Sequence, residues 1–143
     1  MQITIFANAF HIVSGGDKIF AEYAKRWKKA GDTVRLITNE KGKQFCLHHG
    51  IRPTDITVWR ASRADRWGVF GASVYKTMTS LVRSIIQPVG DTGVIFAASF
   101  LWPDLLPAII AKFANPTRTL VVAWYIFAPA PWNGRYQGGF LNG

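Results

Sequence analysis

The order of patterns in the first 38 residues constrains the fold more than any other feature of the chain. Gln2–Ala7 is a short apolar run rich in β-branched side chains, which predicts a strand. A loop that closes on Ser14-Gly15-Gly16 follows, and apolar side chains then recur at helical spacing over roughly 14 residues. Gly31 suits the helix C-terminus, and Thr33–Thr38 predicts a second strand. Strand, glycine loop, helix and strand make a βαβ unit.

The same alternation continues along the chain. We expect further strands at Ile56–Trp59, Gly93–Ala98 and Thr119–Trp124, and helices at Gln44–His49, Phe70–Ile85 and Pro103–Ala114. The last strand is apolar on both faces, as is typical of a buried parallel strand. Gly50 and Pro88 are expected to end helices, and Pro107 to distort the first turn of its helix or delay the start. These patterns predict an α/β, Rossmann-like doubly wound parallel sheet of about five strands, in the order 3-2-1-4-5.

Length and composition fit one domain. The chain has 143 residues, 49% hydrophobic and 17% charged, which rules out a disordered protein. We assign residues 1–127 to a Rossmann-like domain and the Gly/Pro-rich residues 128–143 to the start of a continuation. No signal peptide or spanning segment is predicted, because the longest apolar run, Leu120–Trp132, is interrupted by prolines. The single cysteine, Cys46, excludes an intramolecular disulfide.

The charge is strongly basic, +9 with a pI near 10.1, so nucleic acid, anionic lipid and phosphorylated small molecules are all suitable partners. The densest basic groups are Lys25, Arg26, Lys28 and Lys29, and the arginines between Trp59 and Trp67. Interleaved aromatic and basic residues can stack on bases or lie in a membrane interface, and a solvated helix face with a polar loop explains them equally well. We take Arg60, Arg63, Arg66 and Trp67 as membrane-surface candidates.

The glycine pair Gly15-Gly16 lies where a helix begins after a strand. Glycines let the backbone approach a ligand closely, and free N–H groups at a helix start favour an anion. A contact with a phosphate or sugar is therefore one interpretation, and a tight turn capped by Ser14 or Asp17 is the other. Neither a full G-x-G-x-x-G fingerprint nor a Walker A loop is present, which disfavours NAD and ATP.

Three other residues are candidates because of their position. Ligands of open α/β sheets bind beyond the carboxyl ends of the strands, which favours Ser99 and Asp104 after the fourth strand. Asp104 can equally serve the helix N-terminus electrostatically. His11, in the first loop, can bind a hydroxyl or move a proton, or simply pack there. His48-His49 beside Cys46 lacks further ligands nearby, so no metal site is predicted.

The segment Ile3–Thr38 resembles the start of a GT-B fold glycosyltransferase of the family 4 (group 1) type. The resemblance is carried by Ser14-Gly15-Gly16, by the helix Ala21–Trp27 and by the run Ala30–Thr38, in which Asp32 stands where the family often has histidine. It continues more loosely through Ser99, Pro103 and Leu106-Pro107-Ala108 into the last strand.

The resemblance implies a retaining sugar transferase with a nucleotide-diphosphate sugar as co-substrate and no metal or other cofactor. In this family the N-terminal domain mainly holds the acceptor, here a glycan or a lipid-linked precursor of cell-envelope polysaccharide. Its glycine loop approaches the donor phosphates, a role that Gly15 and Gly16 inherit by position. The acceptor-side candidates are His11, Asp17, Lys18, Ser99 and Asp104. A cytoplasmic location, with peripheral contact to the inner membrane face, is the corresponding expectation.

The family also uses a C-terminal domain with an E-x7-E type pair, and these 143 residues contain no such pair. Trp124-Tyr125 stand where the family often places a histidine, so no catalytic residue is assigned. We expect an N-terminal fragment that is inactive without its C-terminal partner domain. The alternative is a small basic Rossmann-like module that binds a nucleotide or, less favoured, nucleic acid, although no known nucleic-acid module is recognisable.

Overall fold

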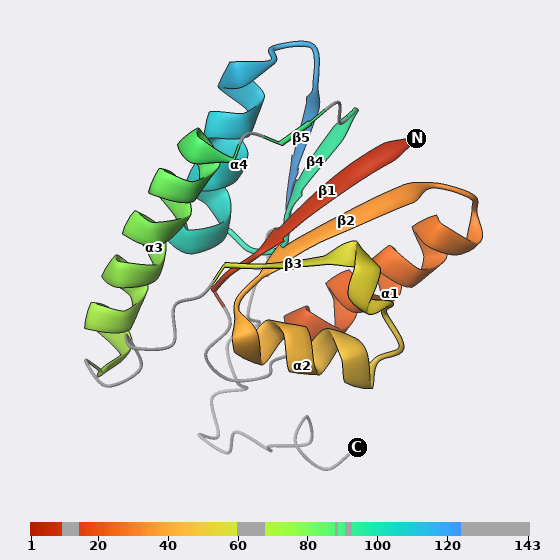
Figure 1. The fold of residues 1–143 in the computed structure, drawn as a ribbon, viewed down its shortest axis with the longest axis horizontal. Helices are drawn as coiled ribbons and strands as arrows, with labels where there is room; N and C mark the ends of the chain where they lie inside the picture. Colours follow the sequence, from red (N-terminus) through yellow and green to blue (C-terminus); the bar gives the residue numbers. More distant parts are fainter. Residues whose placement is uncertain (10–14, 60–67, 88, 91–92, 124–143) are drawn as a thin grey trace, which may run out of the picture.

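The computed structural model describes residues 1–9, 15–59, 68–87, 89–90 and 93–123 (Figure 1). Its elements are β1 (Gln2–Ala7), α1 (Gly15–Lys29), β2 (Thr33–Thr38), α2 (Glu40–His48), a 3-10 turn (Pro53–Asp55), β3 (Ile56–Val58), α3 (Gly68–Ile86), β4 (Val94–Ala97), α4 (Trp102–Ala114) and β5 (Thr119–Val122). All strand pairs are parallel, in the order β3-β2-β1-β4-β5. The predicted fold class and strand order are therefore confirmed.

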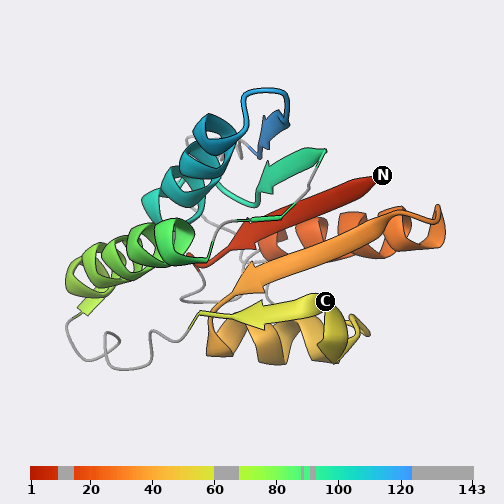
Figure 2. The same ribbon diagram turned by 45° about the horizontal axis from the view of Figure 1, so that its top comes forward.

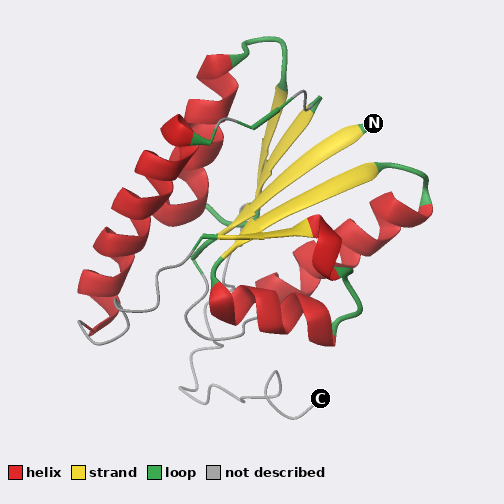
Figure 3. Cartoon of the chain, viewed as in Figure 1, coloured by secondary structure: helices red, strands yellow, loops and turns green. Residues whose placement is uncertain are grey.

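The helices form one layer on each side of the sheet. Helices α1 and α2 cover one face, α4 covers the other, and α3 lies beside α4 (Figures 1 and 3). The turned view in Figure 2 shows the strands fanning between these two layers. The carboxyl ends of all strands point to the same edge of the sheet, because every pair is parallel.

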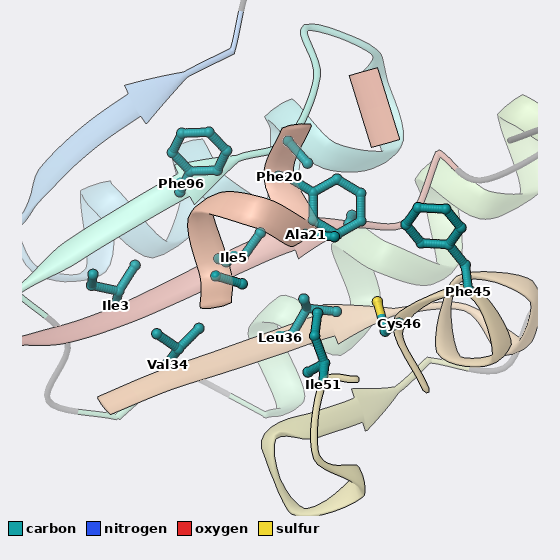
Figure 4. Packing of buried hydrophobic residues seen from close by; sticks show 13 residues of the cluster. Ile3, Ile5, Phe20, Ala21, Val34, Leu36, Phe45, Cys46, Ile51 and Phe96 are labelled. Carbon is teal, nitrogen blue, oxygen red and sulfur yellow. The ribbon is translucent and has the colours of Figure 1, made fainter. Parts of the chain in front are cut away.

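The side chains of β1 alternate between the two helix layers. Ile3, Ile5 and Ala7 point to the α1/α2 layer, where they meet Phe20 and neighbouring apolar residues in one buried cluster (Figure 4). Phe6 points the other way, into a second cluster under α4. This period-two alternation with both faces buried is what a central parallel strand requires.

The second cluster lies between the sheet and α4. Phe6 packs against Trp59, with the ring centroids 5.8 Å apart. Ile37, Ile95 and Ala97 from the strands and Ala108 and Ala111 from α4 complete its buried centre. Small alanines on α4 allow the helix to approach the sheet closely.

Local turn chemistry sets several element ends. Gly31 and Gly50 both have positive φ, +90° and +77°, as expected for glycines that follow a helix. Helix α2 begins at Glu40, four residues before the predicted Gln44, because Asn39 caps it: its Oδ1 accepts from the backbone N–H of Gly42 at 3.0 Å. An N-cap of this kind extends a helix that apolar spacing alone predicts to be shorter.

The last two elements differ in part from the prediction. Helix α4 begins at Trp102 and contains Pro107 in its interior, so of the two predicted effects of this proline the delayed start is wrong. The final strand is not buried on both faces: β5 is the last strand of the described sheet, and Val121 is 40% exposed. Among the described elements, α4 packs against the side of β5 on which Leu120 and Val122 join the second core cluster, and Thr119 and Val121 on the alternate side are exposed.

The orientation of α3 is the least expected feature. The predicted apolar stripe forms a helix, but its side chains point outward: Phe70 is 82% exposed and Met78 57%. The buried residues of α3 are instead small or polar, namely Ala72, Lys76, Ser80 and Ser84. No helix among the described residues is long and apolar enough to cross a membrane.

Candidate functional site

The carboxyl ends of β1 and β4 meet where the connections leave the sheet on opposite faces. Asp104, in the first turn of α4, sends its carboxylate into this region. Its Oδ1 accepts from the backbone N–H of Ala9, at 2.9 Å, and from that of Asn8 through a short hydrogen bond. The carboxylate thereby fixes the start of the loop that leads to α1.

Ser99, two residues after the end of β4, also contacts Asp104. Its hydroxyl donates to Asp104 Oδ2 at 2.6 Å, and its Oγ accepts from the backbone N–H of Leu101 at 3.2 Å. The structure thus brings together two residues that the sequence singled out, Ser99 and Asp104. Ser99 is half-buried and Asp104 only 2% exposed. Because both carboxylate oxygens already have partners, Asp104 is placed to position the loop rather than to touch an acceptor.

Pro107 contributes to the same arrangement. A proline has no N–H, so the carbonyl four residues earlier in the helix lacks its usual donor. That carbonyl belongs to Pro103, and it accepts instead from Asn8 Nδ2 at 3.4 Å. The proline inside α4 therefore leaves an acceptor that holds the end of β1.

A further pair of residues joins β2 to this site. Thr38 Oγ1 donates to the carbonyl of Ala7 at 2.6 Å, and Asn39 Nδ2 donates to the carbonyl of Asn8 at 2.9 Å. All these residues are buried. Asn8 Oδ1 is also buried and has no hydrogen-bond partner in the described part of the chain.

Burial raises the pKa of Asp104 from 3.8 to about 7. Hydrogen bonds from Ser99, Ala9 and Asn8 oppose this shift, and the negative charge of Asp17 adds to it. A proton on Oδ2 can be accommodated, since Ser99 Oγ is able to accept as well as donate. The carboxyl can therefore change its charge near neutral pH without losing its partners.

The start of α1 lies beyond the same edge of the sheet. The helix begins at Gly15, so Gly15 and Gly16 supply N–H groups of its first turn, which suits an anion. Asp17 is half-buried, and Lys18 is exposed. The carboxylate of Asp17 is close enough to influence the pKa of Asp104.

Several predicted site residues lie outside the described part of the chain: His11, Arg60, Arg63, Arg66 and Trp67. Their assignments stay predictions, as does that of the Gly/Pro-rich residues 128–143.

The residues around Cys46 offer no sign of a metal centre. The described residues contain no group of three or more His, Cys, Asp or Glu side chains that could hold an ion. Cys46 itself is buried, and burial with the charge of Asp17 raises the pKa of its thiol to about 12. This thiol is therefore a core side chain rather than a nucleophile.

Sequence reasoning missed Asn8 and Asn39. Each follows a predicted strand directly, which is a usable signal, because asparagine at strand ends and helix starts bonds to backbone groups. Their partners lie far away in the sequence and only the fold brings them together.

None of the comparisons with protein-family models, curated proteins and solved structures finds a match to this chain.

Proposed function

We propose that the chain is the acceptor-side, N-terminal part of a GT-B type glycosyltransferase that uses a nucleotide-diphosphate sugar. The observation that carries the proposal is the organised end of β1: Asp104 fixes the loop of Asn8 and Ala9 beside the point where α1 starts with two glycines. The resemblance of Ile3–Thr38 to family 4 enzymes gives this arrangement its chemical interpretation.

The chemistry follows from the groups at this edge. Backbone N–H groups of Gly15 and Gly16 stabilise the negative charge that develops on the leaving phosphate, without a metal. The exposed ammonium of Lys18 adds positive charge at the same helix end. Ser99, which is half-buried at this edge, offers its hydroxyl to an acceptor, with a glycan or a lipid-linked sugar as the acceptor class.

Transfer is tested with the complete product of the gene. Purified protein is incubated with a panel of nucleotide-diphosphate sugars and a lipid extract, and release of the nucleoside diphosphate is followed. We expect the nucleoside diphosphate to be released from one donor, and only when the acceptor is present. We also expect Lys18→Ala to lower kcat/KM, and the control Lys43→Ala on α2 to leave it unchanged. Absence of turnover with every donor, or a reading frame that ends at codon 143, would contradict the proposal.

Binding is tested on the 143-residue chain by NMR. Titration with nucleotide-diphosphate sugars should shift the amide signals of Ala9, Gly15 and Gly16, and leave those of Gly31 and Gly93 at the opposite edge unchanged. Shifts confined to that opposite edge would refute the site. Salt-sensitive binding of single-stranded oligonucleotides in place of the sugar nucleotide would favour the nucleic-acid-binding alternative.

A further inference from the structure

The outer side of helix α3 is apolar and exposed along most of its length. Its large exposed side chains, each between 45% and 82% accessible, are Phe70, Val74, Met78, Val82, Ile85 and Ile86. The buried residues of the helix lie on the side that packs against α4. Helix α3 is at the margin of the described structure in both ribbon views (Figures 1 and 2), so this outer side, which we call the α3 face, points away from α4. An exposed apolar patch of this extent marks an interaction site.

The spacing of residues along the middle of the α3 face is symmetrical about Met78. Steps of 3, 4, 4 and 3 residues lead along the chain through Gly71, Val74, Met78, Val82 and Ile85. With 3.6 residues per turn, these five positions lie within about 40° of one line along the helix. The series therefore reads the same from either end of the helix, except that the glycine at one end corresponds to an isoleucine at the other.

The middle of the α3 face carries no charge. The charged residues of α3 are Lys76, which is buried, and Arg83. Arg83 is five residues from Met78 in the sequence, which places it about 140° around the helix from that residue. Most charged residues of the four helices belong to α1 and α2, in the layer on the other side of the sheet. Nothing on this face selects an acidic or phosphorylated partner, and its best match is another neutral, apolar surface.

The flanks of the α3 face are polar but already satisfied. The Thr77 hydroxyl donates to the carbonyl of Ser73 at 2.8 Å, and the Thr79 hydroxyl donates to that of Tyr75 at 3.0 Å. The two threonines lie on opposite sides of Met78 in the sequence and about 100° from it around the helix. A protein partner can cover these hydroxyls without leaving a donor unpaired, and an apolar centre between polar borders is the usual composition of a protein interface.

We propose that the α3 face is the interface of a two-fold symmetric dimer, in which α3 packs antiparallel against α3 of a second copy. A two-fold interface must be complementary to itself, which the symmetrical spacing about Met78 provides. Met78 then lies at the axis against its own counterpart, and Val74 meets Val82 of the partner subunit. Ile85 packs over Gly71 of the partner subunit, where the missing side chain leaves room for it. Helices pack in this way with their axes about 20° from antiparallel.

The extent of the α3 face also fits a second copy. Six apolar side chains, each nearly half exposed or more, offer several hundred Å² per copy, which is the order of the roughly 800 Å² that each partner of a standard interface buries. Pairing through α3 turns the basic α1/α2 layers of the two copies away from each other. A helix that lies in a membrane surface usually keeps a strongly charged face toward water, whereas the polar side of α3 is buried against α4.

The dimer leaves the candidate site open in both copies. Helix α3 follows β3 and precedes β4, so it runs from the carboxyl edge of the sheet to the opposite edge. Antiparallel pairing of the two α3 helices therefore places the two carboxyl edges at opposite ends of the dimer. No residue of one copy is needed to complete the site of the other.

Sedimentation of the 143-residue chain tests the association. At about 50 µM, above the micromolar Kd that interfaces of this size have at their weakest, we expect a particle of twice the 16.0 kDa of one chain. Met78→Glu should raise the dimer Kd at least about hundredfold, because it places two like charges against each other at the axis. The position is exposed, so the variant should keep the far-ultraviolet circular dichroism spectrum of the folded chain.

The matched control is Ile19→Glu, at an exposed position of α1. It makes the same change in net charge on the other side of the sheet, beyond the Debye length of about 8 Å from the interface, so the Kd should stay within about threefold of the wild type. A wild type that is monomeric at every concentration, or a Met78→Glu chain that dimerises like the wild type, would overturn the proposal. A monomeric wild type that binds lipid vesicles or a different protein through Met78 would assign the face to that partner instead.

Mixing two variants tests the two-fold axis. Met78→Glu and Met78→Lys should each be monomeric, and an equimolar mixture should form a dimer with one chain of each kind, because a residue at the axis meets its own counterpart. A face that binds a lipid or another protein gives no such recovery. A mixture that stays monomeric would contradict the arrangement about Met78.

Cysteine cross-linking tests the direction of the helices. In the antiparallel dimer the two copies of position 74 lie about 12 Å apart along the axis, at 1.5 Å per residue, which is too far for a disulfide. Val74→Cys mixed with Val82→Cys should therefore cross-link under mild oxidation, and neither variant should do so alone. The native Cys46 is buried and does not compete. Cross-linking of each variant with itself would show parallel helices and refute the proposal.

The inference goes beyond the proposed function and does not depend on it. The association assays contain no sugar nucleotide. A chain that dimerises through α3 but belongs to no active transferase would refute the proposed function alone, and an active transferase that stays monomeric would refute this inference alone.

Discussion

Replacing Asp104 with asparagine should change how stability depends on pH. The folded chain holds the pKa of this carboxyl at about 7, against an ordinary value of 3.8, because the group is buried. Between these values the folded state binds a proton that the unfolded state has released. Stability therefore falls as pH rises through this window, and the loss is complete above about pH 7.

The size of this effect follows from the shift in pKa. The difference between 3.8 and about 7 is roughly three units, and each unit corresponds to 1.36 kcal/mol, which gives about 4 kcal/mol of stability lost between acid and neutral pH. No discount for solvent screening applies, because Asp104 is fully enclosed. This is a large part of the free energy of unfolding of a typical domain, about 5–15 kcal/mol.

Asp104→Asn should remove this dependence. The amide oxygen can still accept from the N–H groups of Asn8 and Ala9, and the amide nitrogen can donate to Ser99 Oγ. We expect the variant to equal the wild type near pH 4 and to be more stable by up to about 4 kcal/mol near pH 8. Asp104→Ala, which loses every one of these bonds, should be destabilised even in acid, by about 2–4 kcal/mol.

Urea unfolding between about pH 4 and about pH 8 measures these values, with a ¹³C carboxyl titration to follow Asp104 directly. Thr117→Ala, at an exposed position that carries no ionisable side chain, is the control and should keep the slope of the wild type. The reasoning is refuted if Asp104→Asn keeps that slope as well, or if the variant is less stable than the wild type near pH 8.

Three further substitutions test the fold. Gly31→Ala should lower the free energy of unfolding by about 1–2 kcal/mol through backbone strain alone, since φ is +90° and nothing lies within 4 Å of an added Cβ. Gly90→Ala, also in open space, is the control, and an equal loss in both variants would contradict this explanation. Asn39→Ala should lose about 1–2 kcal/mol in urea unfolding, because it removes the cap of α2 and the bond to Asn8; an unchanged midpoint would argue against both bonds. Phe20→Ala leaves a cavity in the α1 core and should cost about 3–5 kcal/mol, and a smaller loss would mean that the core collapses around it.

The sequence predicts the fold well wherever local pattern and burial agree. Gln2–Ala7 and Thr33–Thr38 match β1 and β2 residue for residue, because β-branched runs bounded by turn residues leave little choice of ends. Strand order also followed from alternation of elements, since parallel neighbours need crossover helices. At β5 the same reasoning failed, because an apolar strand does not reveal whether a helix covers its second face.

The orientation of α3 could not be predicted from its periodicity. The stripe of Phe70, Met78 and Ile85 correctly indicates a helix, but the usual inference that such a stripe faces the core reverses here. Small side chains on the opposite side, at Ala72 and Ser80, allow close packing on α4, and this depends on what the partner helix presents. An amphipathic pattern shows which residues share a face of the helix. It does not show which of the two faces another element covers.

The candidate site was predictable only in part. Ser99 and Asp104 followed from the rule that ligands bind beyond the carboxyl ends of strands. The partners of Asp104 did not, because Asn8 and Ala9 lie 96 and 95 residues away from it in the sequence. The hydrogen bond from Asn8 to the Pro103 carbonyl could not be predicted either. Pro107 shows that this carbonyl lacks its helical donor, but the local sequence does not show which group donates instead.

The separation between Asn8 and Asp104 also sets an order of events in folding. The unit β1-α1-β2 closes over a few tens of residues, whereas the loop after β1 is fixed only once α4 has docked, 96 residues further on. Contacts that close long loops form late, because their entropy must be lost before the contact is gained. The edge of the sheet that we assign to ligand binding therefore takes shape after the β1-α1-β2 unit, and on a ribosome it stays open until the chain as far as α4 has emerged.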